Sequence, residues 1–118
     1  MQKIRDTLAT ELMGWHVVSE DPPQYHWADS DGRFQMVDIY WHPDTDWTQC
    51  GPVIDAMRAR GTDERPISWS MHQEPMGIWA VQLWQFDDAG HEYMIADARE
   101  ESFTAAVALA AYRAIIGE

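Results

Sequence analysis

The sequence predicts an α+β protein whose sheet is mainly antiparallel and whose helices pack on that sheet. Apolar residues recur at helical spacing in three separate segments, strand-like segments follow one another in runs, and turn sequences divide those runs. We expect a single domain over residues 1–118 with the element order α-ββ-α-βββ-α. A hairpin, a three-stranded meander and three helices would form an α-β-α sandwich-like arrangement.

The first helix is predicted over residues 2–13. Ile4, Leu8 and Leu12 recur every four positions and form one apolar stripe. Gly14 stands where a helix commonly stops, because glycine adopts the left-handed conformation that ends it.

A hairpin is predicted over residues 25–40, after a short extended piece that begins within residues 15–18. The turn is expected at Asp29-Ser30-Asp31-Gly32. Aspartate side chains bond local amides and glycine permits a positive φ, so this run is typical of a tight turn.

The second helix is predicted to begin close to Gly51 and to end at Gly61. Pro52 sets the expected start, because proline lacks an N–H and is best tolerated in the first helical turn. Asp44 or Thr45, in the preceding loop, can cap this helix.

Alternating and continuous apolar patterns predict an antiparallel meander after the second helix. Its strands are expected over residues 67–72, 78–86 and 92–96. A final alanine-rich helix, capped by Asp97 or Ser102, is expected to run to about Ile116. Its small side chains would let it pack very close to a sheet.

The charge balance limits the classes of partner. The chain has 20 acidic and 8 basic residues, a net charge of −12, which repels nucleic acid and anionic membranes and attracts basic surfaces. We therefore predict no direct nucleic-acid binding. The acidity is compatible with solubility alone or with mimicry of nucleic-acid charge.

Location is predicted from cysteine content and hydropathy. The single cysteine, Cys50, cannot form a disulfide within the chain, which favours a reducing compartment. No apolar run is long enough for a membrane span, and residues 1–15 lack the pattern of a signal peptide. We expect a protein of the host cell cytoplasm that does not bind membranes.

Residues 43–55, PDTDWTQCGPVID, resemble a run in phage and prophage proteins of the NinX-like family, which reads roughly S-T-D-W-x-Q-x-G-x-x-I-[DE] before a helix. Residues 9–15 and the last helix, over 103–114, resemble the related phage ABA sandwich domain family. Thr104 and Ala105 stand where that family commonly has a proline, a difference confined to a helix start. The resemblance implies a small α/β sandwich encoded by phages and carries over no catalytic residue.

The candidate binding site for a ligand or partner consists of Asp46, Trp47, Gln49, Cys50 and Gly51. Free amides and the helix dipole at a helix N-terminus favour an anion and would lower the pKa of the Cys50 thiol. Trp47 and Gln49 could stack on a planar ligand and hydrogen-bond to it. In the structural alternative, Asp46 or Thr45 caps the helix, Trp47 anchors it and Gln49 holds a loop.

Motifs for metal binding and catalysis are absent from the sequence. His42, Asp44 and Asp46 are close together, but there is no H-x-x-x-H, no C-x-x-C and no complete calcium loop. There is also no G-x-S-x-G and no glycine-rich phosphate loop. We predict no metal, no cofactor and no catalytic residues, and we expect a protein that is not an enzyme.

Two main functions remain open. The first is a phage or prophage accessory protein that binds a host or phage protein, for example to inhibit a nucleic-acid or defence enzyme through its acidic surface. It predicts carboxylates near exposed aromatic side chains. The alternative is a protein that binds a small, nucleotide-like ligand in a Trp-lined pocket near residues 46–51. An enzyme of unknown type is a second alternative, and exposed Trp side chains would favour a homodimer.

Overall fold

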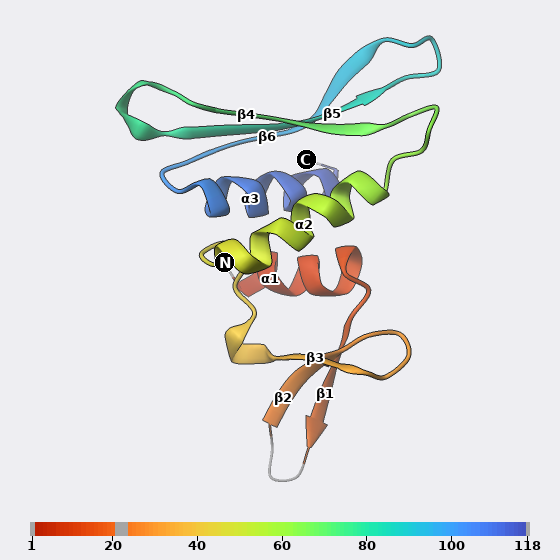
Figure 1. Ribbon diagram of the computed structural model, residues 1–118, viewed down its shortest axis with the longest axis vertical. Helices are drawn as coiled ribbons and strands as arrows, with labels where there is room; N and C mark the ends of the chain where they lie inside the picture. Colours follow the sequence, from red (N-terminus) through yellow and green to blue (C-terminus); the bar gives the residue numbers. More distant parts are fainter. Residues whose placement is uncertain (1, 21–23, 118) are drawn as a thin grey trace.

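The computed structural model contains two antiparallel sheets with helices between them (Figure 1). It describes residues 2–20 and 24–117. Its helices and strands are α1 (Gln2–Thr7), β1 (His16–Glu20), β2 (Gln24–Ala28), β3 (Phe34–Val37), α2 (Trp47–Ala59), β4 (Ile67–Gln73), β5 (Trp79–Phe86), β6 (Glu92–Glu100) and α3 (Phe103–Ile116). Short helical turns lie at Leu8–Leu12, Asp38–Tyr40 and Pro75–Gly77.

The α+β class and the expected element order are confirmed for this part of the chain. The sheet of β4, β5 and β6 covers one side of α3 and α2, while α1 lies on their other side and the sheet of β1, β2 and β3 lies beyond it (Figure 1). The helices therefore form the middle layer, whereas an α-β-α order has a sheet in the middle.

The composition of α3 explains this middle position. Its buried residues follow one another along the helix instead of forming one stripe: Thr104, Ala106, Val107, Ala108, Ala110, Ala111 and Tyr112. A helix that is apolar on nearly all sides is stable only when it is covered on nearly all sides. Its alanines let β5 and β6 approach from one direction and α1 and α2 from the other.

The first helix continues from α1 into a wider π turn at Leu8–Leu12. The amide of Met13 donates to the carbonyl of Leu8 (3.0 Å), and Leu8 and Ala9 are fully buried. Gly14 has a φ of 72°, so the glycine stop lies where the sequence predicted it.

The expected hairpin is present and gains a third strand. β2 pairs with β3 around the predicted turn, where Asp29 Oδ1 accepts from the amides of Asp31 (3.0 Å) and Arg33 (2.9 Å). β1 pairs with the other side of β2, from His16 opposite Ala28 to Glu20 opposite Gln24. The extended piece after the first helix is thus an edge strand of this sheet.

The start of α2 was predicted wrongly. The helix begins at Trp47, and Pro52 lies inside it. Neither Asp44 nor Thr45 caps it; the cap is Asp46, whose Oδ1 accepts from the Thr48 amide (2.8 Å) and hydroxyl (2.6 Å). Pro52 removes the hydrogen bond to the Thr48 carbonyl. Both residues are exposed, so water can replace that bond and the helix continues through the proline.

The meander follows the predicted order, with β5 between β4 and β6. β6 continues to Glu100, so Asp97 lies within the strand. Ser102 is therefore the cap of α3, and its Oγ accepts from the Ala105 amide (3.0 Å).

Candidate functional site

The five predicted site residues point in different directions. Asp46 is used as the cap of α2, and Trp47, the next residue, projects outward with 67% of its surface exposed. Gln49 and Cys50 are buried on the inner side of the helix. Gly51 is half-buried, and a Cβ there would meet no atom within 4 Å. The structure therefore does not bring the five residues together around one ligand.

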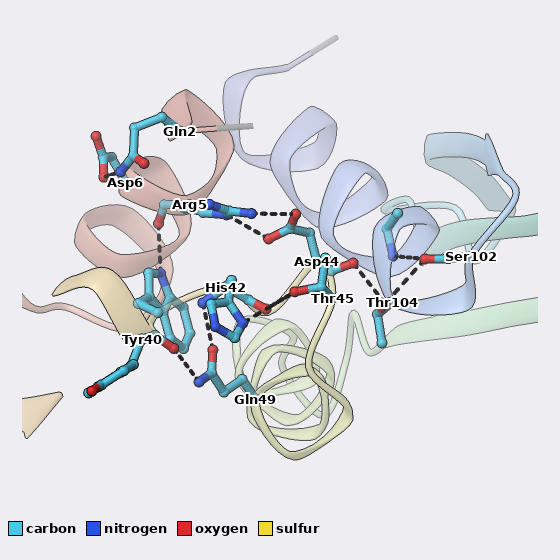
Figure 2. A network of polar contacts seen from close by, with 12 residues as sticks. Gln2, Arg5, Asp6, Tyr40, His42, Asp44, Thr45, Gln49, Ser102 and Thr104 are labelled. Carbon is cyan, nitrogen blue, oxygen red and sulfur yellow. Dashed lines mark hydrogen bonds and ion pairs between the residues drawn. The ribbon is translucent and has the colours of Figure 1, made fainter. Parts of the chain in front are cut away.

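Gln49 holds the loop that precedes α2 (Figure 2). Its Oε1 accepts from the His42 amide (2.7 Å), and its Nε2 donates to the Tyr40 carbonyl (2.6 Å). Nε2 also lies 3.4 Å from Met36 Sδ. Because both its amide oxygen and its amide nitrogen are hydrogen-bonded to the backbone, this side chain stabilises the loop and is not available to a ligand.

Cys50 differs from the expectation of a reactive thiol. Only 1% of its surface is exposed, and burial raises the pKa of the thiol to about 11. The helix N-terminus was expected to lower this pKa, but the side chain packs in the core, where a thiolate is poorly solvated. At neutral pH this buried thiol is therefore protonated, which disfavours nucleophilic chemistry at Cys50.

An ion pair that sequence patterns did not reveal joins α1 to the loop that precedes α2. Arg5 Nε and Nη2 donate to Asp44 Oδ1 (2.8 Å) and Oδ2 (3.1 Å) (Figure 2). Burial alone would raise the pKa of the Asp44 carboxyl, but the hydrogen bonds and charge of Arg5 outweigh it and lower the pKa. The hydroxyl of Thr104 donates to the Asp44 carbonyl (2.7 Å), so this residue joins α1, the loop and α3.

Trp47, Trp79 and Phe103 form a cluster that we call the aromatic surface. The rings of Trp47 and Phe103 are stacked, with centroids 4.8 Å apart and planes at 14°, and Trp79 meets Phe103 edge-on at 5.2 Å. Each is the first residue of its element, respectively α2, β5 and α3. The helix caps Asp46 and Ser102 thus set where two of the three rings project.

The aromatic surface is flanked by carboxylates. Asp46 precedes Trp47, Glu100 is the cross-strand partner of Trp79, and Glu101 lies just before the cap of α3. The nearby Arg99 is already engaged, since it donates to Glu74 Oε1 (2.9 Å) and Asp97 Oδ2 (2.5 Å). The charged residues that adjoin Trp47, Trp79 and Phe103 are therefore mainly acidic.

The seven tryptophans occupy several environments. Trp27 and Trp41 are buried in the core, and the Trp41 indole N–H donates to the Arg5 carbonyl (2.8 Å). Trp47 is the most exposed of them, and the others are half-buried. Most tryptophans therefore stabilise the core, and Trp47 is the one with a large uncovered ring.

An open cavity of about 380 Å³ lies away from residues 46–51. It is lined by Met94, Ile95, Ala96, Asp97 and Arg113, from β6 and α3. No tryptophan and no histidine lines it, so it is neither the Trp-lined pocket that we expected nor a place where a His–carboxylate pair converges.

Within residues 2–20 and 24–117, no three side chains of His, Cys, Asp or Glu come together as metal ligands. Asp44 is bound to Arg5 and Asp46 caps α2, so two of the acidic residues near His42 have other partners. None of the helices described is long and apolar enough to cross a membrane.

Comparison of the chain with protein-family models, with curated proteins and with solved structures found no match.

Proposed function

We propose that this chain is a phage- or prophage-encoded accessory protein that acts in the host cytoplasm by binding a host or phage protein through the aromatic surface. The observation that carries the proposal is the stack of Trp47 on Phe103, with carboxylates beside it. The likeness of residues 43–55 to the NinX-like family supports the phage origin.

The exposed face of Trp47 supports a binding role. Phe103 covers one side of the indole, and 67% of the residue remains accessible. Tryptophan is enriched among the residues that contribute most to protein–protein binding, because its large rigid ring buries much area at little entropic cost. Packing against Phe103 holds the ring in place before a partner arrives, which lowers that cost further.

Met76 adds apolar area close to Trp79 in the sequence. It lies in the turn before β5, is 98% exposed, and has a φ of 75°, a left-handed conformation that is unfavourable for a residue with a side chain. A flexible thioether adapts to irregular binding surfaces. Its presentation in this turn is consistent with contact to a partner.

Charge selects the kind of partner. Asp46, Glu100 and Glu101 flank the aromatic surface, and the whole chain carries a net charge of −12. Such a field accelerates association with a basic surface and repels acidic ones. Proteins that bind nucleic acid have basic surfaces of this kind, so inhibition of a nucleic-acid or defence enzyme is the activity that we favour.

The proposal is tested by capturing partners from host lysate at low salt and measuring their affinity. Trp47→Ala should weaken the affinity at least about tenfold, since removing a central aromatic contact commonly costs about 2 kcal/mol. Raising the salt concentration should also weaken binding, because it screens the charges.

Tyr25→Ala is the matched control, because Tyr25 is an exposed aromatic residue on β2 (56% exposed). It should leave the affinity unchanged. Light scattering on both variants establishes whether a homodimer covers the same surface. If a partner binds wild type and Trp47→Ala equally, or binds independently of salt, the proposal is wrong.

A further inference from the structure

The cavity between β6 and α3 has the size of a small-molecule site. Its volume of about 380 Å³ falls within the range of known ligand pockets, about 300–1,000 Å³. Met94, Ile95 and Ala96 are the apolar residues of its lining. Asp97 and Arg113 give it a polar part.

Arg113 is the cation of this cavity. Its Nη1 donates to the backbone carbonyl of Asp97 (2.7 Å), which fixes the guanidinium against β6. Among the residues that the structure describes, no carboxylate lies within ion-pair distance of it. Arg5, the other half-buried arginine of the described chain, is paired with Asp44 instead. Arginine carries several N–H donors, and only one of those of Arg113 is used within the described protein.

The carboxylate of Asp97 is not an ion-pair partner of Arg113, although Asp97 lines the cavity. Its Oδ2 accepts from Arg99 (2.5 Å) and its Oδ1 from Gln82 (3.3 Å), both on strands of the same sheet. Both oxygens of the Asp97 carboxylate therefore already have partners, and Arg99 shares its single positive charge between Asp97 and Glu74. Within residues 2–20 and 24–117, Arg113 therefore keeps N–H donors that no other side chain or carbonyl uses.

The edge position of β6 adds further donors. In the sheet order β4-β5-β6, no strand of the described part of the chain lies on the side of β6 that faces away from β5. In an antiparallel sheet, alternate backbone N–H groups of an edge strand point to that open side. A ligand beside residues 94–97 would thus meet backbone N–H groups and carbonyl oxygens of β6 as well as the guanidinium.

We propose that this cavity binds a monocarboxylate that carries a small apolar group, with the carboxylate on Arg113 and the apolar group against Met94 and Ile95. Arginine and carboxylate match in geometry, since two parallel hydrogen bonds join them. The net charge of −12 opposes every anion and opposes a phosphate dianion more strongly than a monoanion. A single negative charge is therefore the better fit.

The carboxylate can come from a free small acid or from the C-terminus of a peptide. NMR titration of the ¹⁵N-labelled protein with benzoate and benzamide tests the shared chemistry, because the two probes have similar shapes and differ in charge. Benzoate should shift the Arg113 side-chain N–H and the amides of residues 94–97, and benzamide should not. A short apolar peptide with a free C-terminus, compared with its amidated form, identifies the source.

Arg113→Gln should lower the affinity for benzoate about tenfold or more, because a hydrogen bond to a charged group is lost. Arg58→Gln removes an exposed arginine of α2 and is the control that should bind normally. Equal responses to benzoate and benzamide, or no response at Arg113 to either carboxylate, would overturn the proposal even if Arg113→Gln does not fold. Trp47→Ala should bind benzoate normally, so this result is independent of the aromatic surface.

Discussion

Replacing Arg5 by methionine should destabilise the protein by about 3 kcal/mol. The change removes both hydrogen bonds to the Asp44 carboxylate and keeps most of the apolar stem of the side chain. The Trp41 indole N–H bonds to the backbone carbonyl of Arg5, so that contact survives the substitution. The variant therefore isolates the ion pair.

The magnitude follows from the burial of the two partners. The Asp44 side chain is 3% exposed and that of Arg5 is 28% exposed. Loss of one partner of a buried pair commonly costs about 3–5 kcal/mol, because an uncompensated charge stays behind. Water can reach the site through the space that Arg5 leaves, so we take the lower value. With an unfolding entropy of about 2.1 cal/mol/K per residue, 118 residues give a fall in Tm of about 12 °C.

The pH dependence gives a second, independent signature. In the wild type the pKa of Asp44 is lowered, so its contribution is complete above about pH 4 and is lost as the pH falls through the folded-state pKa. In Arg5→Met the burial of Asp44 is no longer opposed by Arg5, so its pKa should rise. Protonation then relieves the penalty in the variant. The stability difference between wild type and variant should therefore begin to narrow above about pH 4, at the raised pKa of the variant, and should continue to narrow until the pH reaches the lowered pKa of the wild type.

Urea unfolding at several pH values measures both effects. Arg65→Met is the control, because it breaks the Arg65–Asp88 pair, in which Asp88 is 87% exposed, and should cost less than about 1 kcal/mol. Adding Asp44→Asn to Arg5→Met should recover part of the loss, since a buried amide costs less than a buried carboxylate. A loss at pH 7 no larger than that of the control, or a loss that does not change with pH, would refute the reasoning.

Two further predictions concern the residues of α2. Gln49→Leu should lower the free energy of unfolding by about 2 kcal/mol, because the amide of His42 and the carbonyl of Tyr40 lose their partner. The control Gln35→Leu, at an exposed position, should change the free energy of unfolding little. Equal unfolding curves for the two variants would contradict this prediction. The alkylation rate of Cys50 in the native protein should stay low until the pH approaches 11. In denaturant the alkylation rate should rise near the ordinary thiol pKa of about 8.5. If the alkylation rate of the native protein also rises with a midpoint near pH 8.5, the thiol is not buried.

Local signals in the sequence were enough to predict the element order. Gly14 has the expected positive φ, and Asp29 forms the expected turn. In each case the residue acts on backbone within a few positions of itself, so the sequence contains all the information that is needed.

The candidate site could be predicted only in part, because side-chain direction depends on distant contacts. Trp47 and Gln49 both lie in the first turn of α2, yet Trp47 projects onto Phe103 and Gln49 projects onto the loop at Tyr40 and His42. The fate of Cys50 follows from the same orientation. A helix N-terminus predicted from sequence does not show which of its side chains will be buried in the core.

The middle position of the helices also follows from information beyond local patterns. The alanines of α3 indicated close packing against one sheet. They did not indicate that α1 and α2 cover the other side of α3, because that contact depends on how distant parts of the chain pack against this helix. An alanine-rich helix without a polar face is the signal that could have been used.

The contacts of Asp44 have a consequence for folding kinetics. Its carboxylate meets a residue 39 positions away and its carbonyl meets one 60 positions away. Contacts of such sequence separation form only after the chain has adopted its overall topology, because the intervening loops must close first. We expect the loop before α2 to be ordered after the rate-limiting step of folding. The Arg5–Asp44 pair would then slow unfolding while leaving the folding rate nearly unchanged, so it acts on the lifetime of the native state.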